Sequence, residues 1–188
     1  MKTRMLGRFL MTVVLVASAD VAGAASTNRA YVPQGDDAIA KAVRHEIVMY
    51  PRYSIWDDVS FRVADGQVEL TGAVSQPYKK EDIGRLVAKV PGVVSVSNDL
   101  KVLPVSPFDD RLRLQVARAI YSDPSLRRYA TMALPPIHII VENGHVTLDG
   151  VVNNNLEKQI AGMRAASVGL SFGPVVNNLQ VENQQKKS

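Results

Sequence analysis

Over residues 39–71, the spacing of hydrophobic residues changes from helical to strand-like. Ile39, Val43 and Ile47 recur every four residues, which predicts a helix with one apolar face. Apolar and polar residues then alternate over residues 59–63 and 67–71, which predicts two strands that each bury one face. We therefore expect a helix followed by two neighbouring strands, with aspartates at positions 36 and 37 able to cap the helix.

A two-residue turn fixes how those strands pair. Asp65-Gly66 separates them, and this dipeptide favours a type I′ hairpin turn. The turn sets the register, so the inward side chains can be assigned to facing pairs. These pairs are Phe61 with Leu70 and Val63 with Val68.

A second helix and a third strand complete the segment. Ile83, Val87 and Val90 continue a helical period, and Pro91-Gly92 ends it. Residues 95–102 then favour a strand. The predicted order is αββαβ.

The whole pattern occurs twice. Residues 66–72 match 144–150 at an offset of 78, and residues 98–102 match 177–181 at an offset of 79. Leu112, Val116 and Ile120 mark the first helix of the second copy. Its facing core pairs are Ile139 with Leu148 and Val141 with Val146, across Asn143-Gly144. The second copy differs by a longer loop at 125–136 and a glycine-rich turn at 169–174.

The predicted fold class is therefore α+β, with two tandem αββαβ modules. Each module has a three-stranded mixed sheet with two helices on one face. The modules span residues 36–104 and 109–183, and residues 105–108 form a short linker beside Pro104. We expect the modules to contact each other.

The first 25 residues have the pattern of a secretory signal peptide. A basic start is followed by an apolar run over 9–19 and by Ala22-Gly23-Ala24, a small-residue cleavage pattern. The run is about half as long as a membrane-spanning helix requires. We expect cleavage after Ala24 or Ala25, a periplasmic location and no transmembrane segment in the cleaved protein.

The composition excludes several kinds of functional site and one class of partner. The chain has no cysteine, which excludes disulfides, thiolate metal sites, a cysteine nucleophile and a lipoprotein anchor. Without the four charged residues of the predicted signal peptide, the net charge falls from +4 to +2. We therefore expect no nucleic-acid partner, because a global basic field is absent.

The repeated motif resembles the BON domain family. It runs Gly66…Val68-Glu69-Leu70-Thr71-Gly72…Pro91-Gly92-Val93…Asn98-Asp99-Leu100-Lys101-Val102. The second copy lacks the Pro-Gly-Val part but keeps Gly144, Val146, Leu148, Gly150, Asn177, Leu179 and Val181. The resemblance implies an αββαβ fold, an envelope location, phospholipid binding, a role in osmotic stress or envelope integrity, and no catalytic residues. Some two-domain relatives contact anionic lipid through the first helix of the second module.

That helix carries the candidate binding site. With Leu112, Val116 and Ile120 turned inward, basic and amphipathic side chains share the outward face, and two further arginines follow in the loop. The candidates are Arg111, Leu114, Arg118, Tyr121, Arg127 and Arg128. Alternatively, Leu114 and Tyr121 pack against the first module.

Catalytic and metal chemistry have little support. His138 and Asp149 should face each other across the second hairpin, but no serine nucleophile accompanies them. The three histidines lack metal-ligand spacing, and helix or strand ends explain the acidic pair at 57–58. We therefore predict no enzyme activity, no metal and no cofactor. The predicted function is weak contact with anionic phospholipid in support of the envelope. The alternative is a chaperone-like module of the osmotic stress response that binds exported proteins.

Overall fold

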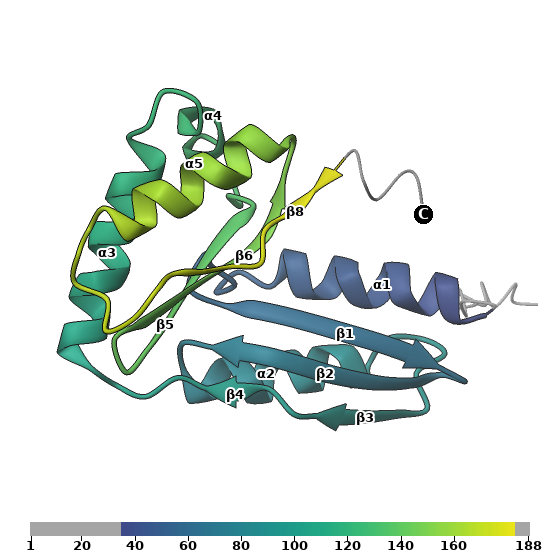
Figure 1. The fold of residues 1–188 in the computed structure, drawn as a ribbon. Coiled ribbons are helices and arrows are strands. Elements are labelled where there is room, and N and C mark those ends of the chain that lie inside the picture. The colour runs from purple at the N-terminus through teal and green to yellow at the C-terminus, as the bar shows by residue number, and fades with distance from the viewer. Residues whose placement is uncertain (1–34, 183–188) are drawn as a thin grey trace, which may run out of the picture. The chain divides into compact units, whose positions relative to one another are not determined.

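The computed structural model describes residues 35–182, so the predicted signal peptide lies outside the described residues. The elements of the first module are α1 (Asp36–Met49), β1 (Asp58–Ala64), β2 (Gln67–Val74), α2 (Pro77–Ala88), β3 (Ser95–Asn98) and β4 (Lys101–Val102) (Figure 1). Those of the second are α3 (Pro107–Tyr121), α4 (Arg127–Ala130), β5 (Ile137–Glu142), β6 (His145–Val152), α5 (Asn155–Ala166), β7 (Val176–Asn177) and β8 (Gln180–Val181). Apart from α4, this is the predicted αββαβ order in both copies.

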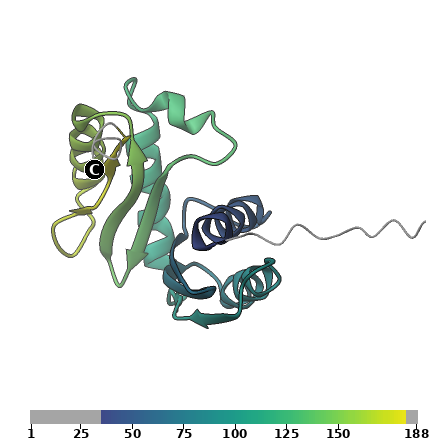
Figure 2. The ribbon, with the colours of Figure 1, turned by 90° about the vertical axis from the view of Figure 1, so that its right-hand side faces the viewer.

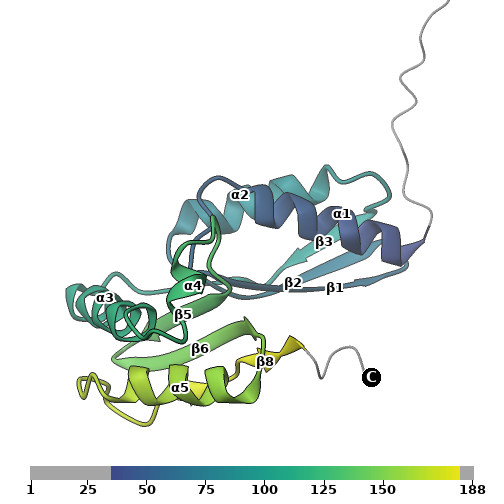
Figure 3. The same ribbon diagram turned by 90° about the horizontal axis from the view of Figure 1, so that it is seen from above.

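The two sheets have the same topology. In each, a central strand pairs antiparallel with the strand before it and parallel with the two short pieces of the last strand. The predicted registers are confirmed, with Phe61 opposite Leu70 and Ile139 opposite Leu148. Figure 3 shows α1 and α2 on one side of the first sheet, and Figure 2 shows the β5–β6 hairpin of the second.

An aspartate in the first turn of each leading helix holds the hairpin turn. Asp36 accepts hydrogen bonds from the backbone N–H groups of Asp65 and Gly66, at 2.8 and 3.0 Å. All four residues of the two turns have positive φ, as a type I′ turn requires. Asp36 therefore satisfies the turn and is not the predicted helix cap, because the N-cap residue of α1 is Gly35, which offers no side-chain cap.

The second module repeats this arrangement with deeper burial. Asp109 accepts from the backbone N–H groups of Asn143 and Gly144 at 2.9 and 2.8 Å, and it is 1% exposed. Ser106 caps α3, which begins two residues before the predicted module boundary. Each carboxylate thus joins helix and hairpin through charge-assisted hydrogen bonds.

The repeated Asn of the sequence motif explains why each last strand is split in two. The Asn98 side chain donates to the Lys80 carbonyl of α2 at 2.8 Å and accepts from the Leu100 backbone N–H at 3.4 Å. Gly84 allows this approach, since a Cβ there would lie 2.6 Å from the Asn98 amide nitrogen. Asn177, Lys158 and Gly162 repeat the contact in the second module.

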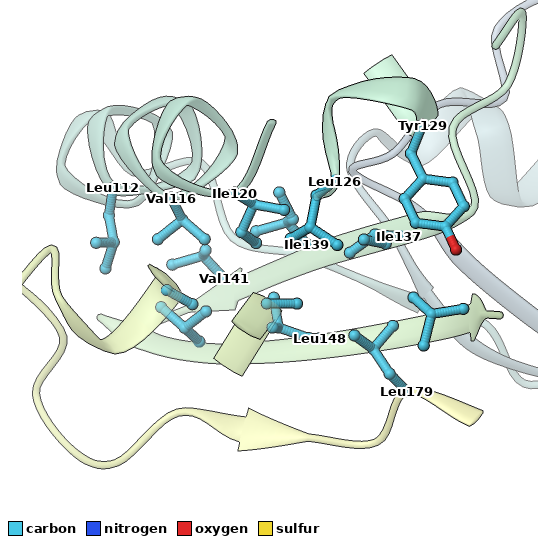
Figure 4. Close-up of a cluster of buried hydrophobic side chains, with 14 of the residues drawn as sticks. Leu112, Val116, Ile120, Leu126, Tyr129, Ile137, Ile139, Val141, Leu148 and Leu179 are labelled. Atoms are coloured by element: carbon cyan, nitrogen blue, oxygen red, sulfur yellow. The ribbon is translucent and has the colours of Figure 1, made fainter. Parts of the chain in front are cut away.

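The second module has an additional piece of core. The segment predicted as a loop over 125–136 contains α4, and it buries Leu126 and Tyr129 beside the α3 side chains (Figure 4). The Tyr129 hydroxyl donates to the Glu157 carboxylate at 2.6 Å. Hydrophobic periodicity does not predict α4, because a helix of four residues is too short to show a helical period.

The first module uses a different buried contact at the matching place. Lys79, 78 residues before Glu157, donates to the fully buried Asp57 carboxylate at 2.6 Å. Two serine hydroxyls complete the network, so the buried charges are hydrogen-bonded. The prediction that a strand end explains Asp57 by solvation is therefore wrong.

The expectation that the modules touch is confirmed by contacts among the described residues. The Ile139 backbone N–H donates to the Ile55 carbonyl at 2.7 Å, and Lys101 pairs with Glu142. Ile55 and Trp56 pack against the core of the second module. The loop before β1 therefore supplies one hydrogen bond to the edge strand β5.

The aspartate contacts can be tested by comparing matched variants. Replacing Asp109 by Ala leaves two turn N–H groups without their acceptor, which should lower the free energy of unfolding by roughly 2 kcal/mol or more. The same change at the half-buried Asp36 should cost less, because water can replace the carboxylate. Urea unfolding of both variants measures the difference. Equal and small losses would contradict the proposed role of the contact.

Candidate functional site

The outward face of α3 is arranged largely as the helical period predicts. Leu112, Val116 and Ile120 are buried in the core of the second module. Arg111 and Arg118 are exposed, and neither forms an ion pair within residues 35–182. The face thus presents two free guanidinium groups to solvent.

An exposed leucine lies between these arginines in the sequence. Leu114 is 48% exposed, so it does not pack fully against the first module as the alternative expected. It borders a cavity of about 250 Å³ together with Trp56 and Val105, which is 88% exposed. We call Arg111, Leu114, Arg118, Val105 and Trp56 the α3 surface.

Tyr121 is not part of this surface. It is half-buried against the core of its own module, and its hydroxyl donates to the Ile137 carbonyl at 2.8 Å. Burial holds the pKa of the Tyr121 hydroxyl well above its ordinary value, so the group stays neutral. The prediction that Tyr121 points outward is wrong. At the end of a helix, the next element can cover a side chain that the helical period places on the outer face.

The two arginines of the following segment have different roles. Arg127 is exposed and has no ion pair among the described residues. Arg128 pairs with Glu157, and its guanidinium lies 4.9 Å from the centre of the Tyr129 ring. Arg127 can therefore add positive charge to the surface, whereas Arg128 holds α4 onto α5.

The helical period does not predict that Arg113 is buried, but the structure shows that it is. Its guanidinium donates to the Val141 carbonyl at 2.7 Å and pairs with Asp110, and it borders the cavity beside Leu114. Its Nε has no hydrogen-bond partner in the described structure. The aliphatic stem fits the apolar side of α3, which explains how an arginine can lie there.

His138 and Asp149 face each other across the hairpin as predicted. Within residues 35–182, no cluster of three or more His, Asp or Glu side chains could hold a metal ion. No helix in that range is long and apolar enough to cross a bilayer.

A comparison with protein-family models decides the family. The BON domain model matches residues 35–104 and again residues 108–183. The chain belongs to the BON domain family. BON domains are generally non-catalytic and associated with membrane or phospholipid interaction, and no enzyme family is detected in this chain.

Comparison with solved structures adds distant matches. Two structures of CdsD, a structural protein of the type III secretion system of Chlamydia trachomatis, match with TM-scores of 0.29 and 0.28. Both are 18% identical to this BON protein and cover 79% and 78% of it. The chain spans 63% and 66% of their lengths. A search of curated proteins finds no match.

The different placement of Leu114 and Tyr121 predicts different effects on stability. Replacing Tyr121 by Phe removes a hydrogen bond to a carbonyl and should lower the free energy of unfolding by about 1 kcal/mol. Replacing Leu114 by Asn should change it by less than about 0.5 kcal/mol, because the side chain is already largely hydrated. Chemical unfolding curves measure both. A larger loss for Leu114→Asn than for Tyr121→Phe would refute the assignment.

Proposed function

We propose that this BON protein is a non-enzymatic module of the cell envelope that binds anionic phospholipid through the α3 surface. The observation that carries the proposal is the combination of the free Arg111 and Arg118 with the exposed Leu114 on one helix face. Basic side chains beside apolar ones favour the boundary between headgroups and acyl chains. Trp56 adds an amphipathic ring of the type enriched at membrane interfaces.

The proposed binding is weak and reversible. Each basic residue near an anionic membrane contributes roughly 1 kcal/mol. Arg111, Arg118 and Arg127 together would therefore concentrate the protein at the membrane without anchoring it. The location that fits this function is the periplasm, reached by means of the signal peptide proposed for residues 1–25.

A second candidate function is contact with exported proteins in the osmotic stress response. Residues 95–98 of β3 form an edge strand without charged or proline residues, which leaves it unprotected against pairing with another chain. Val94, just before this strand, is 77% exposed. An extended segment of a client protein could add to the sheet there.

Sedimentation with vesicles tests the lipid proposal. The protein should sediment with vesicles that contain phosphatidylglycerol and stay in solution with phosphatidylcholine alone. Replacing both Arg111 and Arg118 by Glu should weaken binding by at least about tenfold.

Replacing Lys41 and Lys89 by Glu gives the matched control, because both lysines are exposed in the first module and the net charge changes equally. This control should retain most of the binding. No sedimentation of the unaltered protein would refute the function, and equal losses in the two variants would refute the choice of surface. Suppression of aggregation of an unfolded exported protein, without any lipid binding, would favour the second candidate.

A further inference from the structure

A second cavity shares no lining residue with the one beside Leu114. It is a cleft of about 480 Å³, bordered by Tyr53 and Asp58 from the first module and by His138 and Asp149 from the second. Asp58 begins β1, whereas His138 and Asp149 face each other on β5 and β6. The cleft thus brings together side chains that are 80 or more residues apart in the sequence.

Two carboxylates in this cleft have no cation bound to them. Neither Asp58 nor Asp149 forms an ion pair within residues 35–182. Burial raises the pKa of the Asp58 carboxyl, the charge of Asp149 raises it further, and His138 opposes the shift. The Asp58 carboxylate is therefore poorly hydrated and is repelled by the charge of Asp149, and a positive group between the two carboxylates would relieve both effects.

His138 borders the same cleft and has a ring nitrogen without a hydrogen-bond partner. The side chain is 9% exposed, and its Nδ1 has no hydrogen-bond partner in the described structure. Its ring lies 5.5 Å from that of Tyr53, measured between ring centres. A buried nitrogen without a partner costs free energy, so a ligand that donates a hydrogen bond to it would be favoured.

The acceptors of this cleft suit an organic cation better than a metal ion. Within residues 35–182, no group of three His, Asp or Glu side chains could hold a metal ion. A primary ammonium group has three N–H donors that reach acceptors at about 2.8 Å each, so it spans a wider site. Arg44 also borders the cleft, but its guanidinium lies 5.6 Å from the centre of the Phe61 ring.

We propose that this cleft binds a primary ammonium group, which donates hydrogen bonds to Asp58, Asp149 and Nδ1 of His138. The ring of Tyr53 adds a favourable surface for the cation. Arg44 provides a position for an anionic group on the same ligand. The site shares no residue with the α3 surface, so the proposed function and this site can be tested independently.

Titration with ethanolamine, followed by two-dimensional amide NMR, tests the site. Ethanolamine should shift the amide signals of His138 and Asp149 in a saturable way. Choline should bind at least about tenfold more weakly, because its quaternary nitrogen has no hydrogen to donate. No shift at these residues with ethanolamine, or equal binding of choline, would overturn the proposal. This comparison uses only the unaltered protein.

Two variants locate the binding. Asp149→Asn keeps the size of the side chain and removes its charge, and it should weaken ethanolamine binding by about tenfold or more. Glu69→Gln is the matched control, since it removes one exposed charge on the outer face of the other sheet. Equal weakening by both variants would overturn the proposal, because it would indicate only a general charge effect. Thermal unfolding checks that both variants are folded.

Vesicles identify the source of the ammonium group. If binding to vesicles increases when phosphatidylethanolamine replaces phosphatidylcholine, and Asp149→Asn abolishes the increase, the ligand is a lipid headgroup. If only free ethanolamine binds, the ligand is a soluble amine. The comparison keeps the content of anionic lipid constant, so contact through Arg111 and Arg118 contributes equally to both measurements.

Discussion

In each module, one aspartate holds the hairpin turn against the first helix. Asp36 and Asp109 each accept two backbone hydrogen bonds from residues with positive φ. The turn sets the register of the hairpin, and the register decides which side chains reach the core. The outward side of the same strands then carries Asp58, His138 and Asp149, so the proposed ammonium site depends on this register as well.

The two modules stabilise the start of the second helix with different contacts. Each has a buried charged residue in the first turn of that helix. The first module pairs Lys79 with Asp57, whereas the second pairs Glu157 with Tyr129 and Arg128. The second arrangement recruits a short helix that the first module lacks. It also commits Arg128 to structure and leaves Arg127 exposed for a partner.

The sequence predicts the elements and the registers well, since a period of two or of 3.6 and a type I′ turn are local properties. Long-range polar contacts are harder to predict. A carboxylate that binds a turn 29 residues away has the same local pattern as a helix cap, so the sequence predicts Asp36 as a cap. The helical wheel placed Arg111, Leu114 and Arg118 correctly, but it could not show that Ile137 accepts a hydrogen bond from Tyr121. The cleft was not predictable, because it forms only where the two modules meet.

The single tryptophan can report directly on the lipid-binding helix face that we propose for the second module. Trp56 borders the cavity beside Leu114, so its fluorescence depends on what covers the α3 surface. The decisive measurement is the emission spectrum of Trp56 during titration with anionic vesicles. We expect a saturable blue shift with phosphatidylglycerol vesicles and no shift with phosphatidylcholine. An unchanged spectrum under conditions where the protein sediments with the vesicles would contradict this proposal, because binding would then occur elsewhere.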